Sequence, residues 1–141
     1  MPLKLSLKPG ERFVVNGAVL QNGDRRTVLL LQNKASILRE KDIIQPEEAT
    51  TPARRIYFPI MLMYLDPAEA NRHYDEFVVR LNEFMGVIRS PDILKECVSM
   101  SREVMAAEYY KALTRCRKLL TYEQELLGHV AESVPESGDD D

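Results

Sequence analysis

The sequence is poor in the residues that build metal sites and disulfides. It has no tryptophan, two cysteines and two histidines among 141 residues. Zinc sites need three or four Cys, His or acidic ligands, so His73 and His129 do not favour a metal site. If one helix carries both Cys97 and Cys116, about 28 Å separates them, which is beyond disulfide reach. We therefore expect buried, reduced thiols, with neither a metal nor a cofactor.

Motifs that carry catalysis are missing as well. The chain has no glycine-rich phosphate loop, no CxxC or HExxH motif, and no serine, histidine and aspartate set at a usable spacing. Cys97 would need a nearby base to act as a nucleophile, and two histidines leave few candidates. The sequence predicts a protein that is not an enzyme.

Long apolar runs are also lacking. The longest, Ile56–Leu65, contains Pro59 and is well short of the roughly 20 residues that span a bilayer. Lys4 and Lys8 interrupt the first residues, and no apolar stretch typical of a signal peptide follows. We expect a cytoplasmic protein that does not associate with a membrane.

The first third of the chain has the pattern of short strands. Apolar and polar residues alternate from Leu3 to Leu7, and Pro9-Gly10 and Asn16-Gly17 are strong turn signals. Further β-rich runs cover 12–15, 18–21, 27–31 and 36–39. Five or six short strands so closely spaced predict an antiparallel meander or small barrel.

The remainder of the chain is predicted to be helical. Thr51-Pro52, Asp66-Pro67 and Ser90-Pro91 each combine a capping residue with a proline that suits the first helical position. We expect an α+β protein with a basic β-module at 1–45, a linker at 46–51, and a helical module of three to four helices at 52–128. Residues 129–141 are predicted to form a disordered acidic tail, because Gly128 is a helix-ending residue.

Two stripes are expected on the last helical stretch, which runs to about Leu127, with a break near 99–101 left open. An apolar stripe recurs every seven residues and predicts core or a helix–helix seam. It comprises Val98, Met105, Ala112, Leu119 and Leu126. A basic stripe of Lys111, Arg115 and Lys118 shares one face, and a structural role is favoured for it.

The net charge of −3 hides an asymmetry between the two ends of the chain. Residues 1–44 hold eight basic and four acidic side chains, a balance of +4, whereas residues 129–141 hold five acidic side chains and no lysine or arginine. A basic module with an acidic tail fits an anionic ligand for which the tail competes, or it serves solubility alone. Both interpretations stay open.

Six cations are the candidate ligand-binding residues. Four lie at turns or strand ends of the β-module. The other two open a helix, where the helix dipole disfavours positive charge, so an anionic partner, either a protein carboxylate or a phosphate, would explain them. Pairing with Glu47 and Glu48, or plain solvation, is the alternative. The six candidates are Arg25, Arg26, Lys34, Arg39, Arg54 and Arg55.

Four long strings resemble one known family. LKLSLKPGERFVVNGAVLQNGDRR, LLLQNKASILREKDI, TPARRIYFPIMLMYLD and EYYKALTRCRKLL are similar to the FlbT family of flagellar biosynthesis regulators, over about residues 2–128. The resemblance implies a post-transcriptional repressor that associates with the 5′ untranslated region of flagellin mRNA and promotes its degradation. The expected partner is flagellin mRNA. The alternative is an adaptor that binds flagellin or another flagellar regulatory protein and affects mRNA indirectly.

A shorter stretch has a second likeness. PGERFVVNG, followed by strands and ILREKDI, is similar in pattern to the small carbon storage regulator proteins, which are β-rich RNA binders. On that pattern Arg39 corresponds to their strand-end arginine. Those proteins are strand-exchanged dimers, which leaves open whether this chain forms a homodimer.

Overall fold

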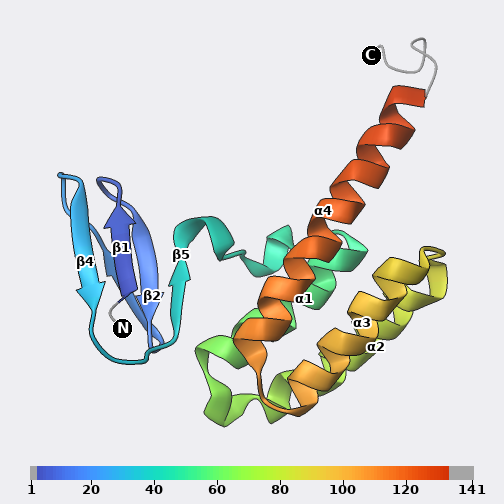
Figure 1. The fold of residues 1–141 in the computed structure, drawn as a ribbon, viewed down its shortest axis with the longest axis horizontal. Coiled ribbons are helices and arrows are strands. Elements are labelled where there is room, and N and C mark those ends of the chain that lie inside the picture. The colour runs from blue at the N-terminus through green and yellow to red at the C-terminus, as the bar shows by residue number, and fades with distance from the viewer. Residues whose placement is uncertain (1–2, 134–141) are drawn as a thin grey trace.

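A small β-module and a four-helix module follow each other along the chain in the computed structural model, which describes residues 3–133, with side chains to 128. The strands lie to one side and the helices to the other (Figure 1). The predicted α+β class, with an antiparallel β-module before the helices, is confirmed. The strands are β1 (Leu3–Leu7), β2 (Arg12–Val15), β3 (Ala18–Gln21), β4 (Thr27–Leu31) and β5 (Ile37–Arg39).

The five strands form two separate antiparallel sheets. One has the order β3-β2-β5, and the other consists of β1 and β4 alone. Leu5 lies opposite Leu29 in the smaller sheet. In the larger sheet, Val14 on β2 lies opposite Leu38 on β5. β1 therefore pairs with a strand distant in sequence and not with its neighbour, so the module is not a simple meander.

The Asn16-Gly17 hairpin joins β2 to β3 as the sequence predicts. Both residues have positive φ, 50° and 84°, which glycine and asparagine adopt more readily than other residues. The Asn16 side chain also accepts a hydrogen bond from the Ser36 amide at 2.9 Å. The hairpin is thereby attached to the segment that leads into β5.

The segment between the modules is ordered into two short 3₁₀ helices, η1 (Glu40–Asp42) and η2 (Pro46–Glu48). The Glu48 carboxylate accepts a hydrogen bond from the Gln45 amide at 2.7 Å. Glu48 thus caps its own turn.

Four helices follow: α1 (Pro52–Leu65), α2 (Asn71–Val87), α3 (Pro91–Met105) and α4 (Tyr109–Ser133), with the 3₁₀ helix η3 (Pro67–Glu69) before α2. The hydroxyls of Thr51 and Ser90 each accept a hydrogen bond from the third helical amide, so these predicted caps are confirmed. Asp66 makes no such side-chain bond. Pro59 lies inside α1, which remains one helix around it.

The helical stretch from Ser90 to Leu127 is broken, as the open alternative allows, but the break does not lie near 99–101. The chain breaks at 106–108, where Ala107 has φ of 59°, and α4 turns back against α3 (Figure 1). The seven-residue stripe is consequently split: Ala112 and Leu119 are fully buried, whereas Met105 is 71% exposed. A heptad pattern cannot distinguish one long helix from two helices joined by a tight turn.

The same break changes the interpretation of the cysteines. Cys97 lies on α3 and Cys116 on α4, so the separation expected along one helix does not apply. Both are free and buried, as the sequence predicts. Burial raises the pKa of the Cys97 thiol to about 11 and raises that of Cys116 still further. At neutral pH both remain protonated.

The last helix also extends further than expected, because α4 continues through Gly128 to Ser133. An interior glycine costs roughly 1 kcal/mol relative to alanine, which a long helix tolerates. The remainder of the predicted acidic tail, 134–141, lies outside the described residues.

One main core joins the two modules. It is built from α1, the inner faces of α2, α3 and α4, and two β-module side chains, Val14 and Leu38. Phe77, Leu81 and Phe84 form the buried face of α2, as their spacing predicts. Within the β-module, Leu5, Leu7 and Phe13 are buried apart from this cluster.

Two tyrosines of α1 bind the β-module to the helices. The Tyr57 hydroxyl donates to the Asp42 carbonyl at 2.6 Å. The Tyr64 hydroxyl donates to the Ile37 carbonyl at 3.0 Å and accepts from the Ile37 amide at 2.7 Å. The two rings are seven residues apart on one face of α1, so a single helix face holds both β5 and η1.

A buried carboxylate from α4 completes the start of α1. Glu123 is 9% exposed. It accepts hydrogen bonds from the Thr51 hydroxyl at 2.6 Å and the Ala53 amide at 3.0 Å. A carboxylate at a helix N-terminus accepts hydrogen bonds from amides that are otherwise unpaired, and its negative charge interacts favourably with the positive end of the helix dipole.

The predicted basic stripe of α4 is structural. The Arg115 guanidinium binds Glu103 at 2.8 Å and Glu96 at 2.6 Å, both on α3. Lys118 lies 3.7 Å from Glu96, and Lys111 lies 3.8 Å from Glu108. The pairs with Glu96 and Glu103 join α3 to α4 after the tight turn, whereas the Lys111 pair is local to that turn.

We expect Glu123→Gln to lower the free energy of unfolding by about 1–3 kcal/mol, because one of two buried donors then faces an amide group that cannot accept its hydrogen bond. Urea unfolding followed by circular dichroism measures this loss. Glu125→Gln removes the same charge from an exposed position of α4 and is expected to change stability by less than about 0.5 kcal/mol. Equal stability of the two variants would contradict the capping role.

Alkaline pH should loosen the contact between the modules. Burial raises the pKa of Tyr57 to about 12, from an ordinary value of 10.0. The folded state therefore holds this proton more tightly than the unfolded state, so its contribution to stability is full below pH 10 and is lost as pH rises through about 12. Thermal unfolding across this range should show a steep fall that Tyr57→Phe reduces. Tyr122→Phe, the control, should leave the fall unchanged.

Candidate nucleic-acid interface

A cleft of about 720 Å³ lies where the β-module meets the helices. Its walls come from β1, the turn at Asn16 and the 34–42 segment of the β-module, and from α1 and α4. Among the side chains that line it are Lys34, Arg39, Lys41, Tyr64, Tyr110 and Arg117. We refer to this feature as the inter-module cleft.

Aromatic rings form the helical wall of the inter-module cleft. The ring centroids of Tyr64 and Tyr110 lie 5.2 Å apart, with a tilt of 43° between the ring planes. The Arg117 guanidinium lies over the Tyr110 ring, 5.8 Å from its centroid. Tyr110 is 49% exposed, so part of this aromatic surface is open to a ligand.

Arg117 is held in place without using all of its donors. Its guanidinium lies 3.4 Å from an Asp42 carboxylate oxygen. Its Nε is buried and has no hydrogen-bond partner among the described residues. A buried donor without an acceptor is costly, so an acceptor supplied at this position would stabilise the cleft.

Lys34 and Lys41 are the cations of the cleft that form no ion pair among the described residues, and we call them uncommitted. Both are exposed, and neither forms an ion pair within residues 3–128. The positive charge that they bring to the two tyrosine rings is therefore available to an anion.

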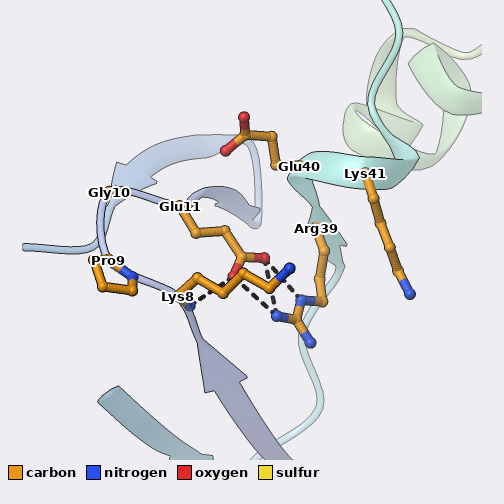
Figure 2. A pocket seen from close by; sticks show the side chains of 7 residues that line it. All are labelled: Lys8, Pro9, Gly10, Glu11, Arg39, Glu40 and Lys41. Carbon is orange, nitrogen blue, oxygen red and sulfur yellow. Dashed lines mark hydrogen bonds and ion pairs between the residues drawn. The ribbon is translucent and has the colours of Figure 1, made fainter. Parts of the chain in front are cut away.

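A second hollow of about 580 Å³ adjoins the cleft, because Arg39 and Lys41 border both. Figure 2 shows Lys8, Arg39 and Lys41 extending along it, with Glu11 between Lys8 and Arg39. Both cavities are thus lined by cations of the β-module.

The Arg39 charge is already partly neutralised by Glu11, at 2.9 Å. Its guanidinium also donates to the Ser6 carbonyl. The hydrogen bond from the Lys8 amide, with the Arg39 guanidinium as a further cause, lowers the pKa of the Glu11 carboxyl. Arg39 thus fastens β5 to β1 and to the 8–11 turn, and less of its charge is left for a ligand than the sequence pattern implies.

Arg25 and Arg26 lie at the same end of the β-module as this second hollow. The turn that carries them is held against the 8–11 turn, because the Gly10 amide donates to the Gly23 carbonyl at 2.8 Å. Both arginines are exposed. About 15 Å of strand β4 separates them from Lys34, so the predicted candidates do not form one compact patch.

Arg54 and Arg55 lie in the first turn of α1, the former half-buried and the latter exposed. The anion that the helix dipole attracts there is Glu123 (described above), which the sequence did not indicate. Glu48, one proposed partner, is committed to its own turn. The helix dipole therefore gives no reason to expect an external anion at these arginines.

The sequence interpretation missed Lys41, Tyr64, Tyr110 and Arg117 of the inter-module cleft, and Lys8 of the second hollow. A signal was present for two of them. Tyr110 and Arg117 are seven apart on α4, the same spacing as Tyr57 and Tyr64 on α1. Residues seven apart share a helix face, so each pair lies on the side of its helix that meets the β-module.

This arrangement suits binding and provides no evident nucleophile. The two thiols are buried with raised pKa values, and no group of three His, Cys, Asp or Glu side chains within the described residues could hold a metal ion. No helix among those residues is both long and apolar enough to cross a bilayer.

Comparison with known proteins assigns the family. The profile of the family described as "Flagellar protein FlbT" matches residues 3–127. The flagellum biosynthesis repressor protein FlbT of Caulobacter vibrioides strain CB 15 is 66% identical over 139 residues, 99% of each chain. A probable repressor of the same name from Caulobacter sp. strain K31 is 70% identical over 131 residues, which cover 93% of this chain and all of the relative.

More distant relatives retain the same description. The probable flagellum biosynthesis repressor protein FlbT 1 of Bradyrhizobium diazoefficiens is 35% identical over 138 residues, 97% of this chain and 92% of the relative. No solved structure matches the fold significantly. The family match over nearly the whole chain and these relatives together show that the chain belongs to the FlbT family.

Proposed function

We propose that this chain represses flagellin synthesis after transcription, by associating with the 5′ untranslated region of flagellin mRNA and promoting its degradation. The names of the relatives, flagellum biosynthesis repressors, support the repressor role. Support for RNA as the ligand comes from the inter-module cleft, where the uncommitted cations Lys34 and Lys41 flank a partly exposed pair of tyrosine rings.

The cleft has the two features that single-stranded nucleic acid needs. Cations track the phosphates, and aromatic faces stack bases, each base contributing about 1–3 kcal/mol. Tyr110 supplies an exposed ring. Unpaired bases of a leader would enter the cleft, while Arg25 and Arg26 would contact phosphates beyond it.

Repression by occupancy requires no chemistry from this protein. A bound leader is closed to ribosomes, or becomes accessible to cellular nucleases, and either outcome lowers flagellin synthesis. Such a function places the protein in the cytoplasm, where the message is translated.

Reversing the charge of the two cleft lysines should weaken RNA binding without unfolding the protein. We expect Lys34→Glu with Lys41→Glu to lower affinity for a flagellin leader transcript by at least about tenfold, because each lost phosphate contact costs binding uniformly. Fluorescence anisotropy with purified protein measures this. The matched control is Lys95→Glu with Arg102→Glu, two exposed cations of α3, which makes the same change in net charge. Equal affinity of both variants would remove the cleft from the site.

Rising salt should weaken the wild-type complex steeply, because phosphate contacts release counterions, with a slope of about −0.7 per neutralised phosphate of a single strand. The double lysine variant should show a shallower slope. Arg25→Glu with Arg26→Glu tests whether the RNA reaches the turn. Binding that does not change between low and physiological salt would contradict the electrostatic basis of the site.

The adaptor function remains the second candidate, because α4 leaves Leu126 and Leu127 exposed by 45% and 56%. These side chains could hold a flagellar protein, with indirect effects on mRNA. Purified protein that fails to bind leader RNA but co-elutes stably with flagellin would favour this candidate. Crosslinking in cells, with both RNA and protein partners identified, separates the two functions directly.

A further inference from the structure

Strand β4 is apolar on both of its faces, and the face that carries Val28 and Leu30 is open to solvent. Its register with β1 places Val28 and Leu30 on one face and Leu29 on the other. These three side chains are 51%, 58% and 39% exposed. Strands that are apolar on both faces are typical of the covered centre of a sheet. Within this chain, however, β4 belongs to a sheet of only two strands, which is marginally stable by itself.

Strand β3 has the same property. Each of its four residues is exposed, Val19 by 72% and Leu20 by 43%. β3 pairs only with β2, and β4 pairs only with β1, so each has one edge of unpaired backbone groups among the described residues. Proteins usually protect such edges with charges, prolines or bulges. Neither AVLQ nor TVLLL contains a charge or a proline.

We propose that a second copy of this chain covers β3 and β4, so that the protein is a homodimer through its β-modules. A two-fold axis that pairs β3 of each copy with β4 of the other closes the two edges whose strands carry no charge in one self-complementary interface. A foreign strand would close only one of them. The edges of β1 and β5 stay open, and these strands carry Lys4 and Arg39. β4 lies at the outer flank of the molecule, away from the helices (Figure 1), so a second copy reaches it without displacing them.

The chemistry of this surface argues against RNA as the occupant. Phosphates need cations, and β3 and β4 contain none. Their exposed side chains are aliphatic, so they offer no aromatic ring for a base. The dimer surface and the inter-module cleft are therefore separate, and the dimer does not depend on the proposed RNA binding.

Sedimentation of the full chain tests the proposal. We expect the dimer to predominate at protein concentrations of about 0.1 mM. The double substitution Val28→Lys with Leu30→Lys should raise the dimer dissociation constant tenfold or more, because two charges would be buried at the interface. The matched control, Val79→Lys with Val87→Lys, changes two exposed valines of α2 (49% and 69%) and should leave the dimer intact. A monomeric wild type, or a dimer equally stable in both variants, would overturn the proposal.

Hydrogen exchange of the wild type locates the interface without any substitution. Amides of β3 and β4 should become more protected as protein concentration rises, since their unpaired edges then gain partners. Concentration-dependent protection confined to α4, where Leu126 and Leu127 are exposed, would show a different dimer and overturn the proposal. The measurement remains decisive if the lysine variants fail to fold.

Discussion

The contact of two tyrosine hydroxyls with the backbone of the β-module is the constraint on which the arrangement of this protein depends. Tyr57 binds the carbonyl of Asp42, and Tyr64 binds both backbone groups of Ile37. Because both hydroxyls come from one face of α1, they set the position and the orientation of β5 together. The inter-module cleft exists because this contact holds the 34–42 segment beside α4. Weakening it would separate the lysines from the aromatic wall.

Most charges near the centre of the molecule serve its own structure. Glu123 caps α1, Arg115 joins α3 to α4, and Arg39 fastens two strands and a turn through Glu11. Partly buried ion pairs of this kind lose much when one partner is removed. Lys34 and Lys41 in the cleft differ from these side chains, because neither forms an ion pair among the described residues. Arg39 is the one cation of residues 1–44 with an ion pair among the described residues, so most of the positive charge of this segment stays available to a ligand.

The β-module has two surfaces of opposite character. On the side toward the helices, Lys34 and Lys41 line a cleft together with tyrosines of α1 and α4. On the other side, β3 and β4 are mostly aliphatic and carry no charge. Phosphate recognition needs the first kind of surface, and burial against another protein surface needs the second. A dimer formed through the outer flank would carry two inter-module clefts. RNA binding by one chain and association between chains would then be compatible in the same molecule.

The sequence by itself determined the elements of this protein and its family. Strand alternation, the Asn16-Gly17 turn and the Thr51 and Ser90 caps are local signals, because each depends on residues a few positions apart. The tertiary structure alone decided the partners of those elements. It set the pairing of β1 with β4, the turn at 106–108, the use of Glu123 as a cap across 70 residues, and the assembly of the cleft from segments distant in sequence. Such contacts depend on which surfaces pack together, and periodicity along one segment does not record that.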